Sequence, residues 1–157
     1  MPPFDPVEII NSAEIRETGE SIAELQLPSG MIPWFPNGHA DPWNHIEAAM
    51  ALDVAGLHDE AESAYQWLAD IQLENGSWHN YYLENEIEQD KIDTNCVAYI
   101  APGVLHHFLI SKDTGFLETM WGVVEPAIEY VLGQQTSRGE IIWACHSDAT
   151  PWSYALV

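Results

Sequence analysis

The fold is decided by the stretch YQWLADIQLENGSW, which occupies residues 65–78. Within it, Gln72 is followed four residues later by Gly76, and then by Trp78. The two other copies of this pattern are Gln26–Gly30–Trp34 and Gln135–Gly139–Trp143. A pattern that occurs three times in one chain predicts a repeat architecture.

The spacing of the copies indicates helical hairpins. Gln72 follows Gln26 by 46 residues and Gln135 follows Gln72 by 63, so the second unit holds an extra loop, which we place in 82–92. Repeats of about 40–50 residues with two helices each are typical of helical arrays, in which several stacked copies bury a continuous core. The extra loop is rich in acidic residues: Glu84, Glu86, Glu88 and Asp90.

The helices of each unit differ in pattern. Residues 58–73 and 113–134 have one polar stripe and one apolar stripe, which predicts surface helices. Residues 43–54 and 94–110 are apolar or small nearly all round, which predicts buried helices. Alternation of the two kinds predicts inner helices that line a centre and outer helices that face water.

We therefore expect an all-α (α/α) toroid of helical hairpins, present as an incomplete N-terminal fragment. The alternative is a complete small domain. The expected parts are an outer helix at about 5–25, helix pairs at about 42–73 and 94–134, and the start of the next inner helix at about 149–157.

Charge and cysteine content limit the partners. The 157-residue chain has 4 Lys and Arg against 25 Asp and Glu, a net charge of -21, which repels nucleic acid and anionic membranes. Cys96 and Cys145 are the two cysteines, too few for a disulfide framework, and no secretory leader is visible. We expect a cytoplasmic protein without a membrane helix, cofactor or metal.

Candidate site residues gather in the loops that join outer to inner helices, because these loops meet at one mouth of the toroid. Aromatic rings stack on sugars, and carboxylates and imidazoles bind hydroxyls or move protons. The candidate catalytic residues are Asp41, Glu47, Asp93 and Asp148. The candidate substrate-binding residues are Trp34, His39, Trp43, His45, Trp78, Tyr81, Trp143 and Trp152.

Each catalytic candidate also has a structural interpretation. Asp41, Asp93 and Asp148 stand at expected helix starts, where Asp is a favoured N-cap. Glu47 lies on an apolar inner helix and needs a partner there, for which His45 is available. A metal site at His39, Asp41 and His45 is disfavoured, because the spacing matches no strong zinc pattern.

Two stretches resemble known toroid families. Residues 65–78 are similar to the QW repeat of terpene cyclases, whose toroid is shared with protein prenyltransferases. Asp93–Asn95, His107–Glu118 and Trp121–Glu125 together resemble the helical hairpins of six-hairpin glycosidases, glucoamylase-like enzymes included. The acid motif of the cyclases and the zinc ligands of the prenyltransferases have no counterpart here, so the resemblance implies the fold more than the reaction.

Three functions follow from these patterns. We expect a carbohydrate-active enzyme that acts on a glycosidic bond with paired carboxylates. A prenyltransferase or terpene cyclase is the first alternative, although His39, Asp41, Asn44 and His45 make the first mouth polar. A non-catalytic helical-repeat binding module is the second.

Overall fold

The computed structural model describes residues 11–148 and 150–152. Its helices are α1 (Ser12–Ala23), α2 (Pro42–Val54), α3 (His58–Asp70), α4 (Thr94–Ala98), α5 (Ile100–Ser111) and α6 (Thr114–Gly133). Its strands are β1 (Tyr81–Leu83), β2 (Glu86–Gln89), β3 (Ile92–Asp93) and β4 (Ala144–Cys145).

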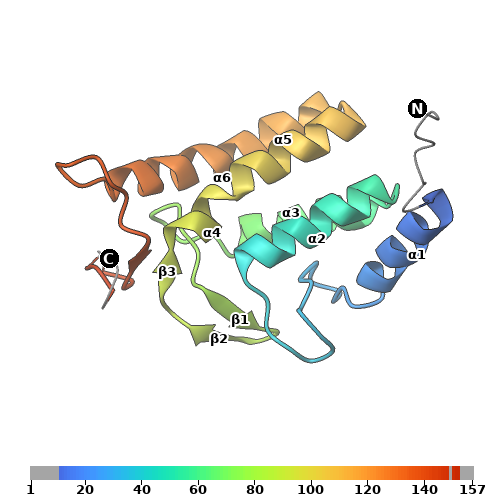
Figure 1. Cartoon of the computed structure of the whole chain (residues 1–157), viewed down its shortest axis with the longest axis horizontal. Helices are drawn as coiled ribbons and strands as arrows, with labels where there is room; N and C mark the ends of the chain where they lie inside the picture. The colour runs from blue at the N-terminus through green and yellow to red at the C-terminus, as the bar shows by residue number, and fades with distance from the viewer. Residues whose placement is uncertain (1–10, 149, 153–157) are drawn as a thin grey trace, which may run out of the picture.

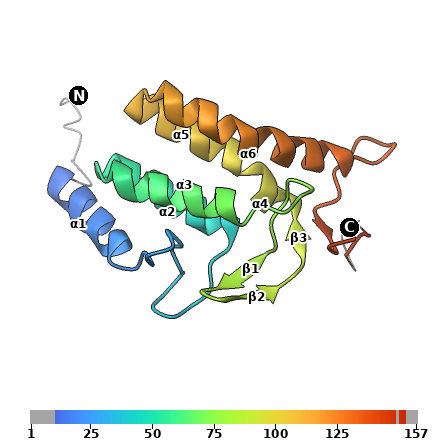
Figure 2. The same ribbon diagram turned by 180° about the vertical axis from the view of Figure 1, so that it is seen from behind.

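The helices form two pairs, α2–α3 and α5–α6, which lie side by side, and α1 flanks α2 (Figure 1). Each pair has one inner and one outer helix, so the helices are arranged in two layers. The reverse view brings α3 to the front of α2 (Figure 2). The inner layer thus consists of α2, α4 and α5, and the outer layer of α1, α3 and α6. Large side chains such as Ile46, Tyr65 and Ile100 are fully buried between the layers.

The inner helices are less buried than their apolar sequences predict. In α5, Leu105 and Leu109 are 53% and 55% exposed, and in α2 Trp43 is 38% exposed. The exposed residues of α5 form one apolar stripe, whereas the exposed stripe of α2 combines Trp43 with the polar residues Asn44 and Glu47. In a toroid these stripes face the centre of the ring.

Local capping sets where the helices begin. Asn11 and Glu14 form a capping box at the start of α1, and Asp41 caps α2, where Pro42 occupies the first turn. Asp93 caps α4 by accepting from the Asn95 amide. The structural interpretation of these two aspartates is therefore correct, and a catalytic role has to be compatible with it.

The Gln–Gly turns bind the hairpins to one another. Gln26 Nε2 donates to Gly30 O at 3.0 Å and to Glu60 O of α3 at 2.9 Å. Gln72 Nε2 donates to Gly76 O and to Val123 O of α6, both at 2.9 Å. The repeated glutamine thus joins its own turn to the next outer helix.

The repeated glycines are required for two reasons. Gly30, Gly76 and Gly139 have φ of 93°, 87° and 100°, which other residues rarely adopt. A Cβ on Gly30 would lie 2.1 Å from Ser63 O, and one on Gly76 would lie 2.3 Å from Pro126 O. The turn therefore approaches the next outer helix too closely for a side chain.

Backbone pairing brings the three inter-helix loops to one end of the molecule. The extra segment is a hairpin in which β1 pairs antiparallel with β2, and an isolated bridge joins Ala40 to Tyr82. β3 pairs with β4, so that Asp93 lies opposite Ala144. The loop before α2 is thus paired with the loop before α4, and the loop before α4 is paired with the segment after α6.

A carboxylate with histidines joins the helices at the other end. Asp53, near the end of α2, accepts from His107 of α5 at 2.9 Å and from His58 of α3 at 3.0 Å. The side chains of Asp53 and His107 are fully buried. Burying a charge is costly unless it is paired, so this contact fixes α2, α3 and α5 together.

Two of the expected helices, at about 5–25 and at about 149–157, lie partly outside the described residues. The expected outer helix at about 5–25 is α1, for which residues 5–10 lie outside them. Of the inner helix expected at about 149–157, residues 150–152 are described and are not helical, since Pro151 bridges to Cys145. Residues 149 and 153–157 lie outside the described part.

No helix among residues 11–148 and 150–152 has the length and apolar character that crossing a membrane requires. Cys96 and Cys145 are both buried free thiols.

Candidate active site

An open cleft of about 290 Å³ lies where the loops meet. It is formed by the start of α2, the β1–β2 hairpin and the start of α4. Its lining residues are Trp34, Asp41, Trp43, Asn44, Asn80, Tyr81, Lys91, Asp93 and Cys96. Five predicted site residues are brought together here: Trp34, Asp41, Trp43, Tyr81 and Asp93.

Asp41 is a buried carboxylate held by three hydrogen-bond donors. Its Oδ2 accepts from Trp34 Nε1 at 2.7 Å and from Asn44 Nδ2 at 2.8 Å, and its Oδ1 accepts from the Asn44 amide at 3.0 Å. Two carboxylate oxygens have about four acceptor positions, so one stays available. Asp41 is only 4% exposed and is therefore held in one orientation at the cleft wall.

A second carboxylate faces the same cleft. Asp93 accepts from the amide and side chain of Asn95 at 3.0 and 3.1 Å, and Lys91 Nζ lies 3.8 Å from its Oδ2. Burial and, to a lesser extent, the charges of Asp93 and Asp41 together raise the pKa of Cys96 to about 12. Both carboxylates are therefore close enough to act electrostatically on one thiol.

Aromatic rings wall the cleft next to Asp41. His39 stacks on Tyr81 with ring centroids 4.5 Å apart and meets Trp34 edge-on at 4.7 Å. His39 Nδ1 lies 2.8 Å from Glu88 Oε2, which fixes the ring from the β2 side. His39 Nε2 is buried without a hydrogen-bond partner. The predicted residue His39 thus supports the wall that Trp34 and Tyr81 form.

Glu47 lies six residues beyond Asp41, on the exposed stripe of α2. It is exposed and does not pair with His45, so that part of the prediction is wrong. Its Oε1 accepts from Trp43 Nε1 at 3.0 Å and from Tyr99 OH at 3.1 Å, and Trp43 stacks on Tyr99 with centroids 4.8 Å apart. Burial and the Glu47 carboxylate raise the pKa of Tyr99.

Two predicted substrate-binding residues are buried core residues instead. His45 is 1% exposed; it accepts from the Ile32 amide at 3.1 Å and donates to Ala64 O at 2.9 Å. Trp78 is 1% exposed and donates its indole N–H to Leu68 O at 2.8 Å. Both side chains point between the helix layers, so neither is available to a ligand.

The third loop contributes less than predicted. Trp143 lies at the rim, where Lys91 Nζ is 4.9 Å from its ring centroid. Asp148 is exposed and accepts from the Thr150 amide and hydroxyl, and Trp152 packs on the His146 ring at 4.4 Å. Neither Asp148 nor Trp152 lines the cleft.

Several residues of the site were missed by sequence reasoning. Asn44 was named among the polar residues of the first mouth but not as a site residue, although its place three residues after Asp41 is that of a donor to the capping carboxylate. Lys91 directly follows the acidic residues of 84–90, a signal that is also present in the sequence. The remaining residues that carried no signal of their own are Asn80, Glu88, Cys96 and Tyr99.

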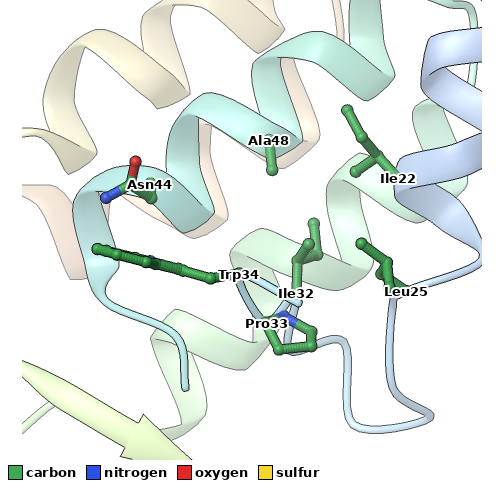
Figure 3. A pocket seen from close by; sticks show the side chains of 7 residues that line it. All are labelled: Ile22, Leu25, Ile32, Pro33, Trp34, Asn44 and Ala48. Carbon is green, nitrogen blue, oxygen red and sulfur yellow. The ribbon is translucent and has the colours of Figure 1, made fainter. Parts of the chain in front are cut away.

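A shallow groove of about 350 Å³ lies on the other side of Trp34 (Figure 3). It is mainly apolar and opens between the end of α1 and α2. Its lining residues are Ile22, Leu25, Ile32, Pro33, Trp34, Asn44 and Ala48. The Trp34 ring borders both this groove and the cleft that holds Asp41.

No three His, Cys, Asp or Glu side chains of the described residues are grouped so that they could hold a metal ion.

The hairpin pairs and the repeated turns define the fold class. The chain has the fold of the (α/α) toroids, of the six-hairpin glycosidase-like kind, as the sequence resemblance predicted. No family model matches the chain.

Individual relatives agree with this class. The chain is 46% identical over 136 residues to an MMP endo-(1,4)-3-O-methyl-alpha-D-mannosidase of Mycolicibacterium hassiacum, a match that covers 87% of this chain and 38% of the relative. Among solved structures, it resembles cellobiose 2-epimerase from Bacillus thermoamylovorans, with a TM-score of 0.69 and 18% identity over 90% of this chain and 41% of that one.

A second solved structure extends the likeness to glycosidases. Endoglucanase Cel10 from Klebsiella pneumoniae, a family 8 glycosyl hydrolase, matches with a TM-score of 0.60 and 12% identity over 77% of this chain and 39% of that one. At these identities the structures establish the fold. The chain spans about two fifths of the length of each of these proteins.

Proposed function

We propose that the chain carries part of the active site of a glycoside hydrolase that cleaves within chains of 1,4-linked, 3-O-methylated α-D-mannose. The 46% identity to a mannosidase of that description supports the substrate class. The observation that carries the proposal is Asp41, a buried carboxylate held by three donors in an aromatic cleft that contains a second carboxylate.

In this proposal Asp41 is the carboxylate that acts as nucleophile or base. Its oxygens accept three hydrogen bonds, and one acceptor position is left for a substrate or a water. Trp34 and Asn44 prevent rotation of the carboxylate, which keeps the reacting oxygen in place. Asp93 is the second carboxylate, and Lys91 balances its charge.

The walls of the cleft suit a methylated sugar. A methyl ether lacks the hydroxyl proton and adds an apolar group, so it is bound better by ring faces than by polar side chains. Trp34 and Tyr81 offer such faces beside Asp41, and Trp43 offers another beside Glu47. We infer that Glu47 accepts a sugar hydroxyl through Oε2, because its two aromatic donors both bind Oε1. Asp148 has no part in this proposal, since it lies outside the cleft.

We also propose that further helical hairpins complete the ring around the cleft. The exposed apolar stripe with Leu105 and Leu109 supports this, since an apolar surface of this kind marks an interface.

The charge of -21 supports the absence of nucleic acid partners, and the free thiols support the cytoplasmic setting that the sequence predicts.

The cleft favours the glycosidase over the prenyl alternative. A prenyl diphosphate needs cations for its phosphates, and among the described residues Lys91 is the only cation that lines the cleft. The Nζ atom of Lys91 already lies 3.8 Å from Asp93 Oδ2.

The test is incubation of the protein with oligosaccharides of 1,4-linked 3-O-methyl-α-D-mannose, and separately with a prenyl diphosphate, followed by mass spectrometry of the products. The proposal predicts shorter oligosaccharides and an unchanged prenyl diphosphate. Turnover of the prenyl diphosphate with intact oligosaccharides would overturn it.

A further inference from the structure

Lys91 and Asp93 lie side by side in the wall of the cleft. They flank Ile92 of β3, which is fully buried, and side chains two residues apart on a strand point to the same side. Lys91 Nζ lies 3.8 Å from Asp93 Oδ2, farther than the distance of about 2.7–2.9 Å at which an ammonium group donates to a carboxylate. The two groups are therefore neighbours that do not bind each other directly.

Both groups keep hydrogen-bonding capacity for a ligand. The two donors to Asp93, which are the amide and the side chain of Asn95, both bind Oδ1, so within the described residues Oδ2 accepts no hydrogen bond. Lys91 Nζ donates no hydrogen bond to another described residue, although the side chain is only 14% exposed. An ammonium group only donates and a carboxylate only accepts. The cleft wall thus presents one donor next to one acceptor.

The substrate of the proposed function carries a matching pair of oxygens. In a chain of 1,4-linked, 3-O-methylated mannose, an interior sugar keeps free hydroxyls at carbons 2 and 6 only. The methoxy oxygen at carbon 3 has no hydrogen, so it accepts a hydrogen bond but cannot donate one. The hydroxyl on the adjacent carbon 2 can donate. Two neighbouring oxygens of one sugar therefore need a donor and an acceptor that lie side by side.

We propose that Lys91 and Asp93 bind these two oxygens, with Lys91 Nζ donating to the 3-methoxy oxygen and Asp93 Oδ2 accepting from the 2-hydroxyl. This inference rests on the proposed function and makes Lys91 a specificity-determining residue. Trp143, which is 39% exposed and has its ring centroid 4.9 Å from Lys91 Nζ, offers an apolar surface for the methyl group.

The order of donor and acceptor distinguishes two isomers of the ligand. A sugar methylated at carbon 2 instead of carbon 3 would place an ether oxygen against the Asp93 carboxylate, which then has no donor. The chain is therefore expected to bind the 3-O-methyl isomer about tenfold or more tightly than the 2-O-methyl isomer, because a buried acceptor left without a partner is costly. This comparison changes the ligand and leaves Lys91 and Asp93 in place.

Calorimetric titration with the trisaccharide of 1,4-linked 3-O-methyl-α-D-mannose measures the binding, in the Asp41→Asn variant to prevent turnover. Lys91→Met keeps an unbranched side chain without donors and is expected to raise Kd about 10–100-fold, the range for a hydrogen bond to a charged group. The matched control is Lys112→Met, since Lys112 Nζ also lies over a ring, 5.9 Å from the centroid of Phe108, but does not line the cleft. Its Kd is expected to stay unchanged.

Deoxy analogues of the interior sugar assign each contact. A 3-deoxy ligand lacks the ether oxygen, so Lys91→Met is expected to bind it as well as the parent chain does. A 2-deoxy ligand lacks the donor to Asp93, so it should abolish the effect of Asp93→Asn and keep that of Lys91→Met. An effect of Lys91→Met that persists with the 3-deoxy ligand, equal binding of the two methyl isomers, or no binding of the trisaccharide would overturn the proposal.

The outcome is separable from that of the proposed function. Binding is measured without turnover, so a wild-type chain that does not hydrolyse the oligosaccharide leaves the expected binding pattern testable. Hydrolysis by a chain that binds both methyl isomers equally would keep the proposed function and overturn the role of Lys91.

Discussion

Gln72 donates a hydrogen bond from Nε2 to the backbone oxygen of Val123, 51 residues further along the chain. The same amide group also binds Gly76 O in its own turn. One side chain therefore joins the end of one helical hairpin to the outer helix of the next. The repeat visible in the sequence is the repeat of this contact.

We expect Gln72→Ala to lower the free energy of unfolding by about 1–3 kcal/mol, because the variant leaves two part-buried carbonyls without their donor. Urea denaturation measures this. The control is Gln66→Ala, whose amide binds Asp70 on the exposed surface of α3 and whose loss is expected to cost less than about 0.5 kcal/mol. Equal effects of the two variants would show that the Gln72 contact does not hold the hairpins together.

Two glycine substitutions are expected to have opposite effects. Gly76→Ala forces a side chain into a turn with φ of 87° and within 2.3 Å of Pro126 O, so it should destabilise the fold strongly. Gly122→Ala adds a methyl group to α6 where no atom lies within 4 Å, and it should stabilise the helix by about 0.5–1 kcal/mol. Thermal melting of both variants tests this, and a melting temperature for Gly76→Ala at or above wild type would refute the close approach.

The pH dependence of stability should report the burial of His45. Burial lowers the pKa of His45 from 6.5 to about 4, while the unfolded chain keeps the ordinary value. As the pH falls below 6.5 the unfolded state takes up a proton that the folded state does not, so stability is lost between pH 6.5 and about 4. The loss amounts to about 3 kcal/mol, since one pKa unit corresponds to about 1.4 kcal/mol.

His45→Gln provides the control, because glutamine can accept from Ile32 and donate to Ala64 without titrating. Urea denaturation from pH 7 to pH 4 should show a smaller loss of stability in this variant than in wild type. Parallel losses in the two proteins would mean that His45 is protonated as easily in the fold as in the unfolded chain.

The repeat and the helix layers were predictable because their signals are local. The Gln–Gly turn needs a glycine with positive φ and a glutamine four residues earlier, and the sequence displays both at Gln72 and Gly76. The aspartate caps follow equally local rules, as Asp41 and Asp93 show. These features depend on a few neighbouring residues, so the sequence alone reveals them.

The strands of the extra segment and the set of residues that line the cleft were less predictable than the repeat and the caps. Strands β1 and β2 fall in a segment predicted as a loop, because an acidic run masks their alternation. Asn80 enters the cleft through the Ala40–Tyr82 bridge, which joins residues far apart in the sequence. His45 and Trp78 have the residue types of a sugar site, but packing between the layers turns them inward.

The most direct test of the proposed active site is the rate at which 1,4-linked 3-O-methyl-α-D-mannose oligosaccharides are cleaved by Asp41→Asn and by Asp148→Asn. Both substitutions remove one carboxylate charge, but Asp41 lies in the cleft and Asp148 in an exposed turn. We expect Asp41→Asn to lower kcat by at least about 1,000-fold with a folded structure by circular dichroism, as the loss of a reacting group does, and Asp148→Asn to keep the wild-type rate. Cleavage by Asp41→Asn at the wild-type rate would contradict the role of Asp41 and, with it, the proposed mechanism.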